Sequence, residues 1–286
     1  MNVFHSALLG LIQGLGEYLP ISSSGHLLLA RFLLGIQDYS GPAQSMYKVL
    51  DILLHVGTLI PLIIVFWKDW WDMLRHPVRN RTLLYLFIAS LPTLVMYIAA
   101  KKLFPDADGF SVFDSGWFLG ASFLITAFFL LVCDIVASHR GSARKNVGFL
   151  QAVVMGIFQG IGLIPGVSRS GSTILGGVLS GLDKKKAASF SFMMSAPAIL
   201  GSLIMEGKDA LEEGLFDHME IFPIAVGILV AALSGYFALR FMLKIVSSVP
   251  LCRFAVYLAV IGIVYLIFQL AGSTLFPAFS PVAAAG

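Results

Sequence analysis

Charged residues are scarce in this chain of 286 residues. Asp, Glu, Lys and Arg together make up 12% of the sequence, whereas 58% of the residues are hydrophobic. The composition therefore excludes a soluble enzyme and predicts a polytopic membrane protein. No polar stretch is long enough for a separate soluble domain, so the membrane unit must hold the function.

Cysteine is almost absent as well. Cys133 and Cys252 are far apart and lie in or beside apolar runs, which excludes a disulfide framework and a CxxC metal or redox site. The N-terminus also lacks the basic segment and the small-residue cleavage site of a signal peptide, so we expect Met1 onward to be mature protein.

Six stretches are long and apolar enough to cross a hydrocarbon core of about 30 Å. They are approximately 49–67, 81–100, 116–137, 187–205, 219–240 and 254–271. Two other apolar stretches, 3–35 and 147–182, are interrupted by glycine, proline, serine and charged residues. Each predicts two half-helices around a polar break. Because irregular backbone at membrane depth must be satisfied by protein or water, we expect both breaks to face an internal site.

The two broken stretches resemble each other. At an offset of 146, GLIQGLGEYLPISSSG (10–25) aligns with GIFQGIGLIPGVSRSG (156–171). The polar residues match as well as the glycines, which argues against chance similarity. The identical positions are Gly10, Gln13, Gly14, Gly16, Ser22, Ser24 and Gly25. Three spans follow each copy, and this odd number predicts halves inserted in opposite orientations.

The expected fold is therefore an all-α integral membrane protein. It has six transmembrane helices plus two re-entrant broken helical hairpins in an inverted-topology repeat. A single membrane domain covers 1–272, with a first repeat at 1–137 and a second at 147–271. The remaining residues, 273–286, are rich in Ala and Pro and are expected to form a flexible tail.

Basic residues predict the orientation, because cytoplasmic loops are enriched in Lys and Arg. Most of the 19 basic residues fall on one side if the loop 68–81 is cytoplasmic. That side contains Lys68, Arg75, Arg79, Arg81, Arg140, Arg144, Lys145, Lys184, Lys185, Lys186, Arg240, Lys244 and Arg253. Both termini are then periplasmic, and the first broken segment enters from outside.

The first break combines groups that suit a metal and an anion. Glu17, four residues after Gln13 and on the same helix face, offers hard oxygen ligands for Mg²⁺ or Ca²⁺. Ser22, Ser23 and Ser24 stand at a helix start, where free N–H groups and the helix dipole favour an anion. His26 follows directly and can exchange a proton or attack phosphorus.

The second break adds a cation at another helix start. Arg169 stands among the hydroxyls of Ser168, Ser170, Ser172 and Thr173. A buried guanidinium needs an anionic partner, and its planar fork matches phosphate. Together the two breaks predict a phosphoryl-transfer site.

Structural roles remain as alternatives. Glu17 and Arg169 could pair with each other, and such a pair would still mark a functional cavity. Asp51 and His55, at helical i, i+4 spacing, and Asp134, near a helix end, are interpreted mainly as structural or supporting residues.

The two motifs resemble a known family. QGLGEYLPISSSGH (13–26) and PGVSRSGST (165–173) are similar to the signatures of the undecaprenyl-diphosphate phosphatases, the bacterial bacitracin-resistance proteins. The first signature, (E/Q)xxxE, falls on Gln13 and Glu17, with its serine and histidine positions on Ser23 and His26. The second, PGxSRSxxT, falls on Pro165, Gly166, Ser168, Arg169, Ser170 and Thr173. Many members have Glu where this chain has Gln13.

This resemblance implies hydrolysis of undecaprenyl diphosphate to the monophosphate carrier lipid, with Mg²⁺ or Ca²⁺, at a site facing the periplasm. Catalytic roles then fall on Glu17, Ser23, His26 and Arg169, and Glu17 and Gln13 hold the metal. Phosphate contacts fall on Ser22, Ser24, Ser168, Arg169, Ser170 and Thr173. The implied location is the bacterial inner membrane. Bacitracin would compete by sequestering the lipid, a homodimer is compatible, and no nucleic acid is involved.

Two other classes were considered. Ser24-Gly25-His26 matches the SGH of the phosphatidic-acid phosphatases, but the positions that should be His and Asp in their partner motif are Leu175 and Leu179. A lipid flippase or secondary transporter is the main alternative, because inverted repeats with broken helices are typical of carriers. The attacking group stays open between His26, Ser23 and water, with His26 favoured because an unactivated serine is weak.

The orientation is testable with single-cysteine variants on a cysteine-free background. A membrane-impermeant thiol reagent applied to intact cells should label positions 40–45 and 106–112 but not 76–80 or 141–145. Labelling at 141–145 without labelling at 106–112 would reverse the assigned topology.

Overall fold

The structure is a computed structural model that describes residues 2–36, 42–77, 79–103, 116–139, 143–144, 146–212, 214 and 220–272. Of residues 42–46 and 48 only the backbone is described. The expected tail 273–286 and most of the loop positions chosen for labelling lie outside these ranges.

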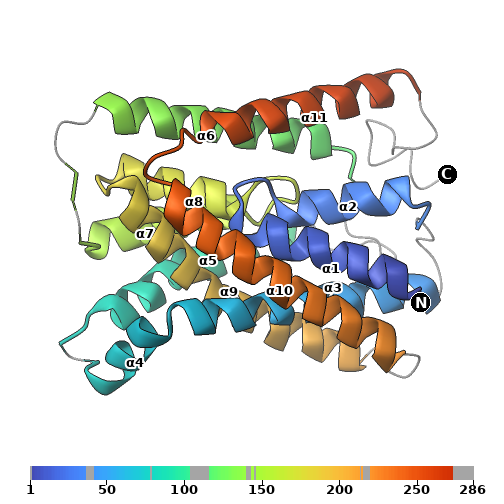
Figure 1. The fold of residues 1–286 in the computed structure, drawn as a ribbon, viewed down its shortest axis with the longest axis horizontal. Coiled ribbons are helices and arrows are strands. Elements are labelled where there is room, and N and C mark those ends of the chain that lie inside the picture. The colour runs from blue at the N-terminus through green and yellow to red at the C-terminus, as the bar shows by residue number, and fades with distance from the viewer. Residues whose placement is uncertain are drawn as a thin grey trace.

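All of the regular elements in the described ranges are α-helices (Figure 1). In chain order they are α1 (Val3–Tyr18), α2 (Ser23–Leu33), α3 (Pro42–Val65), α4 (Trp67–Arg75), α5 (Thr82–Leu103), α6 (Leu119–His139), α7 (Phe149–Ile161), α8 (Arg169–Leu179), α9 (Lys184–Glu212), α10 (Ile221–Ile245) and α11 (Cys252–Leu270). The predicted all-α class is therefore confirmed.

Five of these helices, α5, α6, α9, α10 and α11, are long and apolar enough to cross a membrane. The predicted span at 49–67 meets the same test only when α3 is taken together with α4, from which it is bent by 76°. The described part of the chain thus has five candidate spans, or six if this bent pair counts as one. The protein is accordingly a multi-pass membrane protein.

Helix α4 was not predicted, because residues 68–81 were interpreted as a loop. Trp67, Trp71 and Leu74 recur at helical spacing on an exposed apolar face, while Asp69 and Arg75 are polar. This amphipathic pattern favours a helix that lies along a surface. The charged residues between the apolar ones obscure this helical period in the sequence.

Each broken stretch contains two helices, as predicted. α1 and α2 are separated at residues 19–22, and α7 and α8 at residues 162–168. α1 begins and α2 ends near one end of the molecule, where α11 also ends, whereas α7 and α8 approach from the opposite end (Figure 1). Both breaks lie side by side in the middle of the helix stack.

Small residues let these short helices pack closely against longer ones. α1 packs on α10 with Gly10 against the backbone of Gly227, and α7 packs on α5 with Gly156 against the backbone of Ala89. Thr93 on α5 adds a hydrogen bond of 3.0 Å to the Gly156 carbonyl. Such close backbone approach is how helices associate where lipid removes the hydrophobic drive between them.

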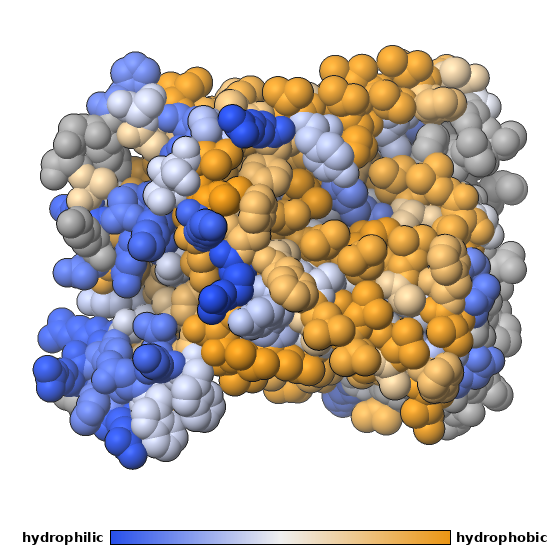
Figure 2. All heavy atoms as spheres, in the orientation of Figure 1, coloured by the Kyte–Doolittle hydropathy of each residue, from blue (hydrophilic) through white to orange (hydrophobic). Residues whose placement is uncertain are grey.

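Hydrophobic and hydrophilic residues occupy different parts of the surface. Hydrophobic residues cover the middle of the molecule in the face shown in Figure 2, and hydrophilic residues gather at the end that carries α4. The candidate spans expose large apolar side chains, among them Phe87 on α5 and Phe237 on α10. This distribution suits a protein whose middle contacts lipid tails.

The α1–α10 contact gives a stability prediction. A Cβ at Gly10 would lie 3.1 Å from the Gly227 carbonyl carbon and even closer to its oxygen, so Gly10→Ala should destabilise the fold by about 1–3 kcal/mol. Gly201→Ala is the matched control, because a Cβ at Gly201 would meet nothing within 4 Å. Thermal unfolding in detergent should show a lower melting temperature for Gly10→Ala and an equal or higher one for the control. Equal behaviour of the two variants would contradict the close approach.

Candidate active site

An ion pair joins the two broken stretches at their breaks. Arg169, the first residue of α8, donates through Nη2 to Oε1 of Glu17, which lies in the last turn of α1. The Glu17 side chain is 4% exposed and that of Arg169 is 18% exposed. The alternative that these two residues pair with each other is confirmed. Because the pair is largely shielded from water, loss of either partner would leave a buried charge without compensation.

The second carboxylate oxygen of Glu17 accepts two more hydrogen bonds. Ser23 donates through Oγ at 3.0 Å and Gln13 through Nε2 at 3.0 Å. Ser23 is the first residue of α2, and Gln13 lies one turn before Glu17 on α1. The Glu17 carboxylate of α1 therefore binds side chains from α1, α2 and α8.

Two helix N-termini meet at this point. Ser22 and Ser168 are the N-cap residues of α2 and α8, and their hydroxyls accept from the N–H groups of Gly25 at 3.3 Å and Gly171 at 3.1 Å. The cap at Ser22 places Ser23 and Ser24 inside the first turn of α2, and α8 begins at Arg169, where a helix start was predicted. The N–H groups at the start of a helix have no partner within it and attract anions.

The serines next to the caps repeat the same geometry. Ser22 and Ser24 share a hydroxyl contact of 3.3 Å, and Ser168 and Ser170 share one of 3.2 Å. Ser22 has a φ of 71°, the only positive value of a non-glycine residue in the described ranges. Strained backbone of this kind persists where surrounding contacts hold it, and it is common at functional sites.

The two breaks also touch each other directly. Ser170 donates to the carbonyl of Leu19 in the first break at 3.2 Å. Thr126 on α6 donates to the carbonyl of Gly166 at 3.2 Å and accepts from the N–H of Ser168 at 2.9 Å. These bonds hold the cap of α8 against the α1–α2 turn.

His26 lies in a different set of contacts. Its Nδ1 is 2.8 Å from the carbonyl oxygen of Ser22, which can only accept, so Nδ1 donates. Its Nε2 is 2.9 Å from the hydroxyl of Tyr257 on α11, and the two rings are stacked. In the described residues no hydrogen bond or ion pair joins His26 to Glu17, Ser23 or Arg169. Tyr257 carried no signal in the sequence, because it is one aromatic residue in an apolar helix.

The hydroxyl of Thr173 is bonded to other protein groups, which suits a structural role better than a contact with phosphate. It is fully buried, donates to the Arg169 carbonyl at 2.7 Å and contacts the Ser191 hydroxyl of α9 at 2.5 Å. Ser168 and Ser170 are also buried, whereas Ser24 is exposed. Among the residues predicted to contact phosphate, all of which the structure describes, only Arg169 forms an ion pair with Glu17.

His55 on α3, which was interpreted from the sequence mainly as a structural or supporting residue, lies near the site. It lies within electrostatic reach of Glu17, and its Nδ1 donates to the Asp51 carbonyl at 2.8 Å. Tyr18 binds the carbonyl of Thr58 one turn further along α3. Asp51 itself pairs with Arg31, and Asp134 pairs with Lys184 at 2.5 Å, so both aspartates have the structural roles that were predicted.

The donor set suits a hard cation that takes other ligands from substrate and water. Gln13 Oε1 is buried and has no hydrogen-bond partner, while Nε2 of the same amide donates to the Glu17 carboxylate. In the described ranges no group of three or more His, Cys, Asp or Glu residues could hold a metal by itself. Mg²⁺ in particular is often bound by one or two protein oxygens together with phosphate and water.

The ion pair leads to a prediction about folding. Arg169→Gln should destabilise the protein by about 3–5 kcal/mol, because it leaves the Glu17 carboxylate buried and unpaired. Combining it with Glu17→Gln should recover more than half of that loss, as measured by thermal unfolding in detergent. The control is Lys208→Gln, which breaks an exposed pair with Glu212 and should cost about 0–1 kcal/mol. A loss for Arg169→Gln no larger than this control would be inconsistent with a buried pair.

Comparisons with known proteins identify the family of this chain. The family model described as bacitracin resistance protein BacA matches residues 6–264. A protein named undecaprenyl-diphosphatase from Carboxydothermus hydrogenoformans is 37% identical over 273 residues, covering 95% of this chain and 99% of the relative. One of the same name from Halothermothrix orenii is 39% identical over 268 residues, covering 93% and 98%. The chain belongs to the bacitracin resistance protein BacA family.

Proposed function

We propose that this protein hydrolyses undecaprenyl diphosphate to undecaprenyl phosphate and inorganic phosphate. The relatives that bear the name undecaprenyl-diphosphatase align over nearly the whole chain. The observation that carries the proposal is the cluster of the buried Glu17 with the partly buried Ser23 and Arg169, at the meeting point of two helix N-termini. A diphosphate is the kind of anion that such a junction attracts.

Arg169 binds the terminal phosphate. Its Nη1 is buried and has no hydrogen-bond partner, although Nη2 is paired with Glu17. A guanidinium in this position offers donors to phosphate oxygens, and the first-turn N–H groups of α2 and α8 lie on either side. The charge that develops on the transferred phosphoryl group is stabilised by these fixed donors.

Ser23 attacks the terminal phosphorus. Its hydroxyl already donates to Glu17, which accepts the proton as the new O–P bond forms and the bridging P–O bond to undecaprenyl phosphate breaks. Water then hydrolyses the seryl phosphate to free serine and inorganic phosphate. Of the attacking groups left open by the sequence, Ser23 is favoured because it contacts the carboxylate and His26 does not.

His26 acts as a positioning residue in this scheme. Nδ1 holds the carbonyl of Ser22, whose backbone is strained, and Nε2 is occupied by Tyr257. The imidazole thereby fixes the turn that aims Ser23 at the substrate.

Glu17 and Gln13 would hold a divalent cation, Mg²⁺ or Ca²⁺. A bound cation would neutralise charge on the diphosphate. The orphaned Gln13 Oε1 supports this assignment.

The architecture behind the site is an inverted-topology repeat with six spans, with halves at 1–137 and 147–271 in one domain. Equivalent helices in the two halves make equivalent contacts, since α1 packs on α10 as α7 packs on α5, and α3 on α10 as α9 on α5. The matching caps Ser22 and Ser168 support the same relation. Both termini then face the periplasm, and the site opens toward it from the inner membrane.

In the cell this reaction regenerates a lipid carrier for peptidoglycan and other envelope polymers. Bacitracin competes by sequestering the lipid substrate. The protein works in the membrane without nucleic acid, and a homodimer is compatible with the fold.

The test of function is phosphate release from undecaprenyl diphosphate by purified protein in detergent. Release should depend on Mg²⁺ or Ca²⁺ and stop when a chelator is added. Metal-independent binding of the lipid without release would instead favour the flippase or transporter class.

The same phosphate-release assay distinguishes the proposed roles of Ser23 and His26. Ser23→Ala should lower turnover by roughly a thousandfold or more, because it removes the attacking oxygen. His26→Ala should also lower turnover, but His26→Asn should recover a substantial part, since an amide can still donate to the Ser22 carbonyl. Retained turnover in Ser23→Ala, with no recovery in His26→Asn, would make the imidazole the attacking group.

A further inference from the structure

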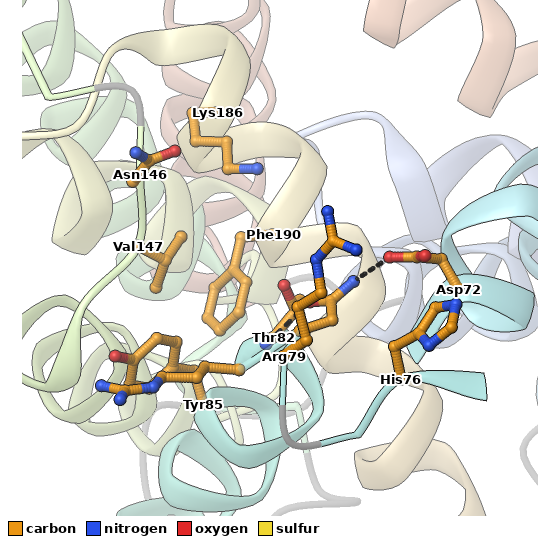
Figure 3. Close-up of a pocket in the computed structure, with 11 residues that line it drawn as sticks. Asp72, His76, Arg79, Thr82, Tyr85, Asn146, Val147, Lys186 and Phe190 are labelled. Atoms are coloured by element: carbon orange, nitrogen blue, oxygen red, sulfur yellow. Dashed lines mark hydrogen bonds between the residues drawn. The ribbon is translucent and has the colours of Figure 1, made fainter. Parts of the chain in front are cut away.

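A second polar site lies far from the Glu17 cluster, at the end of the molecule that carries α4. It is a pocket of about 530 Å³ formed by α4, the segment that follows it, the start of α5, the segment before α7 and the first turns of α9 (Figure 3). This volume is within the range of roughly 300–1,000 Å³ that is typical of small-molecule sites.

The pocket carries an excess of positive charge. Arg79, Arg81 and Lys186 line it, and Asp72 is the one acidic residue in the lining. Figure 3 shows Arg79 and Lys186 extending into the same space from different segments. In the part of the chain that the structure describes, none of these three cations forms a salt bridge. Several other basic residues are paired, among them Arg31 with Asp51 and Lys184 with Asp134.

Hydrogen bonds fix the walls of the pocket. Asn80 donates through Nδ2 to Asp72 at 2.6 Å and accepts at Oδ1 from the N–H of Thr82 at 3.1 Å. On the other side, Arg144 bonds through its backbone to Gly181 and Asp183, which holds the segment before α7 beside the start of α9. These hydrogen bonds hold the loops that carry the cations in place. The Asp72 carboxylate already accepts the hydrogen bond from Asn80.

Helix α4, which forms part of the pocket, has the pattern of a helix at the level of lipid headgroups. α4 is bent by 76° from α3 and exposes Trp67, Trp71 and Leu74 on its apolar face, while Arg75 lies over the Trp71 ring. Tryptophan on an amphipathic helix marks the boundary between lipid tails and water. Asp72 of the same helix and His76, its C-cap residue, line the pocket, and Phe190 and Val147 give it an apolar wall.

We propose that this pocket binds the phosphate group of an anion at the membrane surface, either an anionic phospholipid headgroup or free phosphate. Arginine donors match the oxygens of phosphate, and each basic residue near a membrane surface adds to anion binding. The site is independent of the proposed phosphatase activity, since it shares no residue with the Glu17 cluster.

Protection of Lys186 from an amine-acylating reagent tests the proposal at the pocket itself. The purified protein is acylated briefly in detergent, and labelling is read at each lysine by peptide mass spectrometry. Lys185, its exposed neighbour on α9, is the internal reference. Micelles containing dioleoylphosphatidylglycerol, micelles containing dioleoylphosphatidylcholine, and sodium phosphate at matched ionic strength are added in separate arms.

Phosphatidylglycerol or phosphate should slow labelling of Lys186 relative to Lys185, and phosphatidylcholine should not. Protection by the anionic lipid alone identifies a headgroup site, protection by phosphate alone identifies a site for the free ion, and protection by both identifies the phosphate group as sufficient. If neither protects Lys186 more than Lys185, the proposal is wrong.

A matched pair of variants checks that the pocket, and not general surface charge, is responsible. Arg79→Gln should raise the half-protecting concentration about fivefold, which corresponds to about 1 kcal/mol for one basic residue. Arg253→Gln removes an exposed charge at the same end outside the pocket and should leave that concentration unchanged. Arg81→Gln serves as the second pocket variant if Arg79→Gln does not fold. Equal shifts in the pocket and control variants would overturn the proposal.

Discussion

The pairing of Glu17 with Arg169 is the interaction on which the rest of this structure depends. Each residue alone would be a charge shielded from water, and together they fix the ends of two short helices that come from opposite ends of the molecule. Once these ends are fixed, the cap serines, the strained Ser22 and the Ser170–Leu19 contact follow from the same junction. The proposed chemistry and the predicted stability of the protein therefore depend on the same two side chains.

A polar junction of this kind requires that neighbouring helices come very close. Gly10 and Gly156 provide that approach, because each stands where a side chain would collide with the backbone of α10 or α5. The short helices α1 and α7 are thereby held along longer ones without large apolar side chains between them. Close packing leaves Glu17, Ser22 and Ser168 buried at the breaks, and burial strengthens the electrostatic contacts that these residues make.

The sequence predicted the broken helices and the charged residues of the site, but it did not predict all of the side-chain contacts between them. Interruptions in apolar stretches and the match between 10–25 and 156–171 indicated two broken helices, and charge chemistry indicated that Glu17 and Arg169 could meet. The contact between His26 and Tyr257 could not be predicted, because it joins residues 231 positions apart and one of them is an ordinary aromatic residue in an apolar helix. Helix α4 was missed because its charges masked an amphipathic period.

The two halves of the site share the same helix-cap positions but carry different reactive side chains. At the offset of 146, Ser23 corresponds to Arg169, Glu17 to Leu163 and His26 to Ser172, whereas the caps Ser22 and Ser168 are identical. A dimer of the first half alone would bring two carboxylates together without a cation, and a dimer of the second would bring two guanidinium groups together without an anion. The unequal copies thus make the proposed catalytic centre a property of the fused chain, which neither half could reproduce by self-association.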